Sequence, residues 1–174
     1  DSAGASLPSA VGKRIDYMSN RLSIPVGFHA HNNLSLAVAN SIAAVESGAQ
    51  IIDGTTRGFG AGAGNCQLEV LAAVLEKIGY KTDIDVYQLM DISENIVSSI
   101  AKNSQGISGT SLISGIGGVF SSNAPHVMKA AKEFQVDPRD IFMEMGRRKT
   151  VGGQEDIIVE VAAELCRKGY GIQS

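Results

Sequence analysis

Two histidines, His29 and His31, stand one residue apart at the end of an apolar, β-branched stretch that is typical of a strand. Alternate side chains of a strand lie on one face, and the strand rise places their Cα atoms about 7 Å apart. Two imidazoles on one face can hold a divalent metal ion between them. We therefore predict a metal site at the end of this strand; a pair of solvated loop histidines is the alternative interpretation.

The chain also offers candidates for the rest of such a site. Two histidines and one carboxylate leave open positions on a metal for substrate oxygens. Asp1 and Asp53 stand near predicted strand ends and are candidates for the carboxylate. Asp53 can equally bond to backbone. The carboxylate ligand can also come from a segment that precedes Asp1. Asn32 and Asn33 either hold the imidazoles in one tautomer or cap the next helix.

A glycine-rich segment, residues 58–65, carries glycines at alternate positions directly before a predicted helix. Glycine lets the backbone approach a ligand closely, and the N-terminal end of a helix presents N–H groups to anions. We therefore predict a loop that binds an anion or substrate; the alternative is a flexible turn in which Asn65 caps the helix. Asn65 is also a candidate for the metal shell. The glycines expected to line the loop are Gly60, Gly62 and Gly64.

Composition sets the broad class of the protein. The chain has 174 residues, of which 44% are hydrophobic and 19% charged, and this is typical of a soluble globular protein of one domain or one and a half. A net charge of −3, with basic residues dispersed apart from residues 147–149, argues against nucleic-acid binding. No apolar run approaches the ~20 residues of a membrane span, so we expect no membrane segment.

The cysteines and the start of the chain indicate its cellular setting. Cys66 and Cys166 lie in helix-like surroundings far apart in the sequence, which favours reduced, inert thiols over a disulfide framework. No secretory leader opens the chain, and we expect a cytoplasmic protein. Residues 1–4 resemble the end of a strand whose body precedes them, so we expect part of a longer polypeptide.

Helices and strands alternate in the first part of the chain. Such alternation predicts βαβ units with parallel strands. A doubly wound sheet and a (β/α)8 barrel both satisfy this pattern, and polar clusters at three successive strand ends favour the barrel. A full barrel takes ~250 residues, so these units would supply only its closing portion. The expected helices are residues 7–22, 34–47 and 67–78, and the expected strands are residues 24–31 and 49–55.

The alternation stops after Tyr80, and the remainder is predicted to be mostly helical. We therefore assign residues 1–80 to the C-terminal portion of a barrel and residues 81–174 to a helical domain. Apolar spacing predicts helices at residues 86–102, with Leu89, Ile96 and Ile100 inward, and at residues 124–134, 138–147 and 154–168.

Three segments of this second part have less definite interpretations. Residues 107–120 mix glycine, serine and isoleucine and receive no assignment. His126 has no spaced partner and is interpreted as a surface or core histidine. Residues 150–156 place two glycines before an acidic helix start, which by itself is typical of a cap and turn.

Three blocks resemble a known family: residues 29–41 (HAHNNLSLAVANS), 58–69 (GFGAGAGNCQLE) and 146–156 (GRRKTVGGQED). The chain is similar to the C-terminal half of the 4-hydroxy-2-oxovalerate aldolases. These belong to the metal-dependent (β/α)8 family that includes isopropylmalate synthase and hydroxymethylglutaryl-CoA lyase. The first block is shared across that family, the second differs from the Gly-Glu-Arg-Ala-Gly-Asn of the condensing synthases, and the third is associated with the aldolases alone.

The resemblance implies a lyase. His29 and His31 would be ligands of Mn²⁺, other divalent metals being compatible with the same residues. The aspartate ligand and the general base would lie in barrel strands outside this chain, which is therefore expected to be inactive alone. The implied reaction is retro-aldol cleavage of 4-hydroxy-2-oxopentanoate to pyruvate and acetaldehyde, in the meta-cleavage degradation of aromatic compounds.

The resemblance also implies a partner. The helical domain would contact an acylating acetaldehyde dehydrogenase and pass it the aldehyde through a channel bordered by Gly152 and Gly153. Phe120, in the substrate pocket, stands where many of these aldolases carry Tyr, so a role for that hydroxyl does not carry over. Two alternatives stay open: an acyl-CoA-condensing synthase of the isopropylmalate or homocitrate type, and a non-catalytic interaction fragment.

Overall fold

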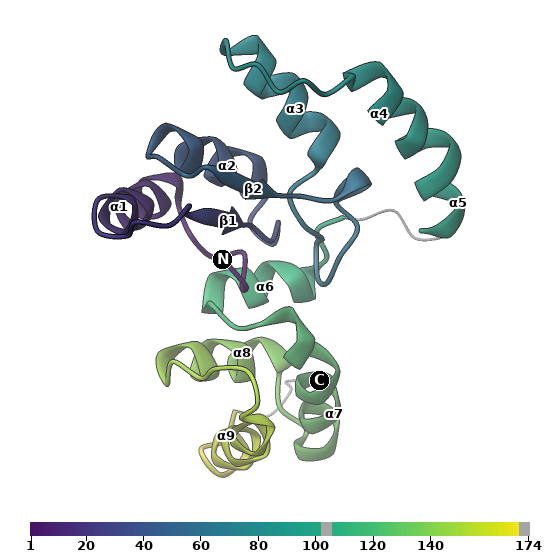
Figure 1. Ribbon diagram of the computed structural model, residues 1–174. Helices are drawn as coiled ribbons and strands as arrows, with labels where there is room; N and C mark the ends of the chain where they lie inside the picture. Colours follow the sequence, from purple (N-terminus) through teal and green to yellow (C-terminus); the bar gives the residue numbers. More distant parts are fainter. Residues whose placement is uncertain (102–105, 171–174) are drawn as a thin grey trace. The chain divides into compact units, whose positions relative to one another are not determined.

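The computed structural model describes residues 1–101 and 106–170. Within it the chain forms two compact units, Asp1–Ile107 and Ser108–Ser174. The first unit combines strands with helices, and the described part of the second is helical (Figure 1). The α/β organisation expected from the sequence is therefore confirmed for the first unit.

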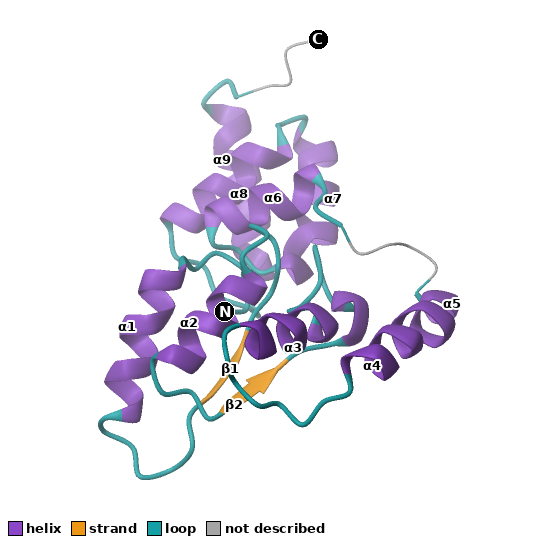
Figure 2. Cartoon of the chain, turned by 90° about the horizontal axis from the view of Figure 1, so that it is seen from above, coloured by secondary structure: helices purple, strands orange, loops and turns teal. Residues whose placement is uncertain are grey.

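Two short parallel strands form the centre of the first unit, β1 (Gly27–His29) and β2 (Ile51–Asp53). Figure 2 shows them side by side in orange. Their register places Gly27 opposite Ile51 and His29 opposite Asp53. The predicted parallel pairing is confirmed, and each strand is shorter than predicted because only three residues of each are paired.

Three helices cover these strands: α1 (Pro8–Ser19), α2 (Ala37–Glu46) and α3 (Leu68–Lys77). The apolar stripe predicted for the first helix is buried, since Val11 and Ile15 pack with Val26 and Ala44. A second cluster joins Ala30 to residues of α2 and α3. Burial of these apolar side chains is the main favourable term that holds helices and strands together.

The helical run after α3 also belongs to the first unit. It consists of α4 (Val86–Ile92), the π-helical turn η2 (Ser93–Val97) and α5 (Ser98–Ile100). Ser93 Oγ donates a hydrogen bond to Glu69 Oε1 at 3.1 Å, and Arg57 pairs with Glu94 at 3.2 Å. The run is thereby tied to the residues around α3, and the first compact unit extends to Ile107.

The helical run of residues 86–100 buries few of its side chains. The predicted inward positions Ile96 and Ile100 are 54% and 70% exposed, whereas Ser93 is buried. Large apolar side chains before the π-turn are exposed as well, since Met90 and Ile92 are 46% and 42% exposed. The prediction of Ile96 and Ile100 as core residues was therefore wrong.

The described part of the second unit, residues 108–170, contains the helices α6 (Gly109–Gly117), α7 (Ala124–Phe134), α8 (Pro138–Arg147) and α9 (Glu155–Arg167) and the 3-10 turn η3 (Ser121–Asn123). A further 3-10 turn, η1 (Thr56–Gly58), belongs to the first unit. The three helices predicted here correspond to α7, α8 and α9. Helix α6 lies in the segment left unassigned. The largest buried side chains of this core include Val119, Val127, Ile141, Phe142, Met145, Ile158 and Val161.

Small residues explain why a glycine- and serine-rich segment is helical here. Ser108 and Ser111 form a reciprocal capping box at the start of α6. At its other end the helix packs closely on α8: a Cβ on Gly146 would lie 2.0 Å from the carbonyl oxygen of Gly117. The two backbones can approach this closely only because neither residue has a side chain.

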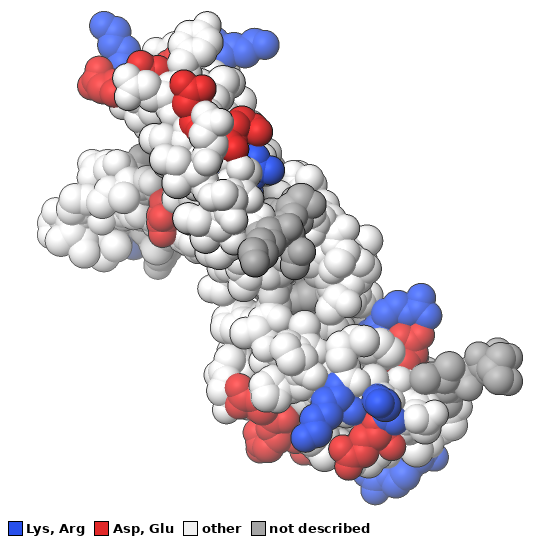
Figure 3. All heavy atoms as spheres, turned by 90° about the vertical axis from the view of Figure 1, so that its right-hand side faces the viewer, with Lys and Arg blue, Asp and Glu red and all other residues white. Residues whose placement is uncertain are grey.

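An arginine joins α8 to α9. The guanidinium of Arg148 pairs with Glu144 at 3.0 Å, Glu160 at 2.9 Å and Glu164 at 2.8 Å. Figure 3 shows both acidic and basic side chains on the lower body, which is this unit.

None of the helices in the described ranges is long and apolar enough to cross a bilayer. Both cysteines are free, Cys66 buried and Cys166 exposed. Cys66 precedes α3 and so lies outside the helix. Burial raises the pKa of the Cys66 thiol, which keeps it protonated and a poor nucleophile.

We expect Gly146→Ala to lower the free energy of unfolding of the second unit by about 1–3 kcal/mol or more, because its methyl group meets the backbone of α6. Urea denaturation followed by circular dichroism measures this. Gly109→Ala is the matched control, since its methyl group would meet nothing within 4 Å. Equal stability of the two variants would contradict the close approach of α6 and α8.

Candidate functional site

The two histidines come together at the end of β1. Their ring centroids lie 4.9 Å apart with an interplanar angle of 73°, an edge-to-face arrangement. His31 lies just past the strand, where it forms an isolated antiparallel bridge with Asn65. The expectation that both rings leave the strand on one side therefore agrees with the geometry.

Asp53 contacts the first of these rings. Its Oδ2 lies 2.9 Å from His29 Nδ1, because the strand register puts the two residues opposite each other. The sequence suggested a metal ligand or a backbone-bonded group at this position. In the structure the Asp53 carboxylate instead contacts Nδ1 of His29. The other ring nitrogen, Nε2, takes no part in this contact.

His31 has a different environment. Its Nδ1 is buried and has no hydrogen-bond partner within the part of the chain that the structure describes. Burial lowers the pKa of His31, and the neighbouring His29 lowers it further. The ring is therefore neutral near pH 7, the form that an imidazole must have to bind a metal.

Asn65 brings a second buried atom without a described partner. Its Nδ2 donates to the carbonyl of Phe59 at 2.9 Å, while its Oδ1 is buried and unpaired among the described residues. Helix α3 has Gln67 at its N-cap position, so the capping role considered for Asn65 was wrong. A buried acceptor without a partner is costly, and a bound ion or water is the usual explanation.

The two asparagines after His31 hold the surrounding segments. Asn33 is fully buried, donates to the carbonyl of Ala3 at 3.0 Å and accepts from the amide of Ala63 at 3.0 Å. Asn32 accepts from the amide of Ala37 at 3.2 Å, whereas Leu36 occupies the N-cap position of α2. Asn33 therefore connects the start of the chain, the histidine segment and the glycine segment.

The acidic candidates do not complete a cluster. The Asp1 carboxylate accepts hydrogen bonds from the amides of Ala5 and Ser6 at 3.0 and 3.2 Å and so closes a turn. Among the described residues there is no group of three His, Cys, Asp or Glu side chains that could hold a metal. His126 is exposed on α7, which agrees with its interpretation as a surface histidine.

The glycine segment folds back onto Asn65. Gly62 and Gly64 have positive φ angles of 65° and 92°, and a Cβ on Gly60 would lie 2.4 Å from Asn65 Nδ2. Residues 65–67 separate this loop from α3, and the first amide of that helix, Leu68 N, donates to Thr55 O. The loop therefore does not open directly onto the helix end as the sequence suggested.

The sequence reasoning missed one polar contact beside this loop. The amide of Arg57, whose φ is 58°, donates to both carboxylate oxygens of Glu69 at 2.9 and 3.1 Å. Neither spacing nor periodicity marks the pair, although an acidic residue in the first turn of a helix is a common feature. The contact fixes the start of the loop to α3.

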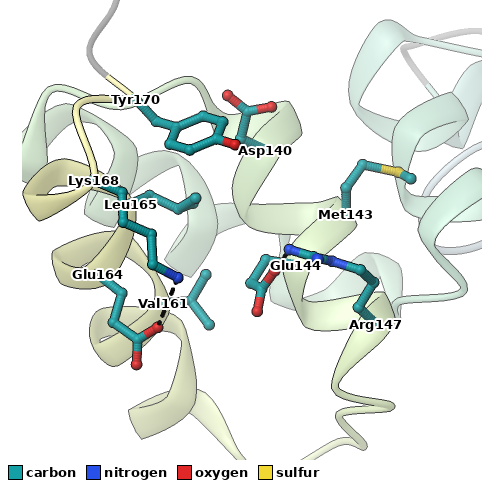
Figure 4. A pocket seen from close by; sticks show the side chains of 9 residues that line it. All are labelled: Asp140, Met143, Glu144, Arg147, Val161, Glu164, Leu165, Lys168 and Tyr170. Carbon is teal, nitrogen blue, oxygen red and sulfur yellow. Dashed lines mark hydrogen bonds and ion pairs between the residues drawn. The ribbon is translucent and has the colours of Figure 1, made fainter.

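The remaining candidates belong to the second unit. A Cβ on Gly152 would lie 3.1 Å from two ring carbons of Phe120, so the aromatic ring packs directly on this glycine. Gly153 has a φ of 87° and open space where a Cβ would stand. A separate hollow of about 310 Å³ lies between α8 and α9. Figure 4 shows its lining side chains, among which Arg147 pairs with Glu144 and Lys168 with Glu164.

Comparison with known proteins identifies the family. Residues 1–96 match the HMGL-like family, more than half of the chain. The chain belongs to the HMGL-like family. Residues 105–167 of this HMGL-like chain match the DmpG-like communication domain.

Curated relatives of the HMGL-like chain are 4-hydroxy-2-oxovalerate aldolases, as the three sequence blocks predict. The protein from Moorella thermoacetica is 52% identical over 171 residues, which are 98% of this chain and 51% of the relative. That from Geobacillus thermodenitrificans is 55% identical over 168 residues, 97% of this chain and 49% of the relative. The chain thus spans about half the length of the curated relatives it matches.

Among solved structures, the HMGL-like chain is similar in fold to the carboxyl transferase domain of pyruvate carboxylase from Rhizobium etli. The TM-score is 0.74 at 16% sequence identity, over 98% of this chain and 31% of that chain. At this identity the likeness concerns the fold alone.

We expect Asn33→Ala to destabilise the first unit by about 1–3 kcal/mol for each backbone group that loses its partner, Ala3 O and Ala63 N, because both residues are buried. Chemical denaturation measures the effect. Asn95→Ala removes an exposed side chain of the same size and should change stability by less than about 0.5 kcal/mol. Similar losses in both variants would contradict this role of Asn33.

Proposed function

We propose that this HMGL-like chain is part of a divalent-metal-dependent 4-hydroxy-2-oxovalerate aldolase, which cleaves 4-hydroxy-2-oxopentanoate to pyruvate and acetaldehyde. The observation that carries the proposal is the pair of histidine rings at the end of β1, 4.9 Å apart. It occurs in a chain that is 52–55% identical to curated aldolases over nearly its whole length. A cytoplasmic location and a place in aromatic degradation are expected with this activity.

His29 and His31 would hold the metal, with the Asn65 oxygen as a further ligand or an outer partner. The fit rests on chemistry present in the chain: a neutral His31, a His29 whose Nδ1 contacts Asp53, and an unpaired buried oxygen on Asn65. A bound divalent cation such as Mn²⁺ would supply Lewis-acid stabilisation of the charge that develops on the 2-oxo oxygen during C–C cleavage.

The rest of the reaction needs groups from outside this chain. We propose that β1 and β2 are closing strands of a (β/α)8 barrel whose other strands supply a carboxylate ligand and the base that takes the 4-hydroxyl proton. Within this chain, Asn33 holds the glycine loop against the histidine segment. Gly60, Gly62 and Gly64 would let that loop approach the anionic substrate.

For the helical part, residues 81–174, we propose contact with an acylating acetaldehyde dehydrogenase. The match of residues 105–167 to the communication domain supports this. Gly152 and Gly153 would border the route of the aldehyde, and the packing of Phe120 on Gly152 is consistent with a shared role in shaping that route and the substrate pocket.

The test is complementation. We expect the chain, mixed with the N-terminal half of the Geobacillus thermodenitrificans relative and Mn²⁺, to release pyruvate from 4-hydroxy-2-oxopentanoate, and each part alone to be inactive. His29→Ala or His31→Ala should lower the rate by about 100-fold or more, since removing a ligand costs at least as much as removing a group that orients one. His126→Ala, which changes an exposed histidine on α7, is the matched control. Pyruvate is measured with lactate dehydrogenase and NADH.

Other outcomes would contradict the proposal in different ways. Turnover by the chain alone would show that it contains its own base. Condensation of acetyl-CoA with a 2-oxo acid would favour the synthase. The sequence of residues 58–65 argues against that alternative, because it differs from the Gly-Glu-Arg-Ala-Gly-Asn of the condensing synthases. Co-elution with the dehydrogenase, without cleavage by any mixture, would favour an interaction module.

A further inference from the structure

We propose that Asp53 is a positioning residue that holds the ring of His29 in the tautomer with its proton on Nδ1. The part of this inference that concerns metal rests on the proposed function. The part that concerns the ring rests only on the contact between Asp53 and His29, 2.9 Å from Oδ2 to Nδ1.

Backbone pairing creates this contact. His29 and Asp53 are directly opposite each other at the end of the parallel ladder, so their side chains leave the same face. Each residue is the last of its strand. The two side chains therefore meet through the register of β1 and β2, without depending on a flexible loop.

The contact determines where the proton of His29 lies. An ionised carboxylate can only accept hydrogen bonds, and a neutral imidazole has a single N–H. The proton of a neutral His29 must therefore be on Nδ1, which leaves the lone pair on Nε2. A carboxylate bonded to the other ring nitrogen also makes a histidine a stronger metal ligand.

The two histidines differ in this respect. His31 Nδ1 has no hydrogen-bond partner within the described ranges, and that residue is placed by backbone bridging to Asn65. Asp53 therefore positions the ring of His29 and not that of His31. The Asp53 side chain is 66% exposed, so its removal should change the ring of His29 with little loss of fold stability.

The first readout is the tautomer of His29 in the metal-free chain, measured by ¹⁵N–¹H correlation spectra of the imidazoles. The chain has three histidines, so His31→Ala and His126→Ala assign the signals. We expect the Nδ1–H form in the unsubstituted chain and a shift toward the Nε2–H form in Asp53→Ala. Asp53→Asn should retain much of the Nδ1–H form, because its amide oxygen can still accept the bond.

The second readout is the affinity for Mn²⁺ alone, measured by titration calorimetry on the chain mixed with the N-terminal half of the relative. Asp53→Ala should weaken binding by about 10–100-fold and Asp53→Asn by less. Asp91→Ala removes an exposed carboxylate on α4 and should change neither readout.

The possible results distinguish the positioning role of Asp53 from the metal site of the proposed function. An unchanged tautomer in Asp53→Ala would overturn the positioning role. A changed tautomer with unchanged Mn²⁺ affinity would overturn its importance for the metal. A tautomer that responds as expected in a protein that binds no Mn²⁺ would support the role of Asp53 toward His29 and overturn the metal site in the proposed function.

Discussion

The register between β1 and β2 is the constraint on which the candidate site depends. Three residue pairs define it, and the last of them sets His29 beside Asp53. A slip of one residue would turn every side chain of one strand to the other face. The apolar packing of the helices on these strands opposes such a slip, because Val26 and Ile52 would then leave the clusters that they share with α1 and α2.

The segments after the strands need a different kind of restraint, since they form no regular ladder. Asn33 provides it through hydrogen bonds to two segments that are far from it in the sequence. A buried amide that bonds to backbone on both sides specifies one arrangement, because any other leaves polar groups unpaired. His31 Nδ1 and Asn65 Oδ1, which have no hydrogen-bond partner among the residues that the structure describes, belong to residues joined by a backbone bridge. This contrast is what directs attention to a ligand there.

The second unit is held by other means. Its helices meet through a shared apolar core, a glycine contact between α6 and α8, and the carboxylates around Arg148. The block of residues 146–156 contributes to two of these, since Gly146 makes the close contact and Arg148 the ion pairs. A block that first marked the resemblance to the aldolases thus also organises the packing of α8 against its neighbours.

The sequence by itself determined the order of helices and strands, the parallel pairing and the approach of the two histidines. These depend on local periodicity and on the alternation of side chains along a strand, which neighbouring residues fix. Only the tertiary structure decided that Asp53 meets His29, that Asn33 joins three segments, that Gly117 of α6 packs on Gly146 of α8, and that Ile96 and Ile100 are exposed. Each of these depends on partners or backbone geometry that sequence spacing does not encode, because the residues meet only when distant segments pack.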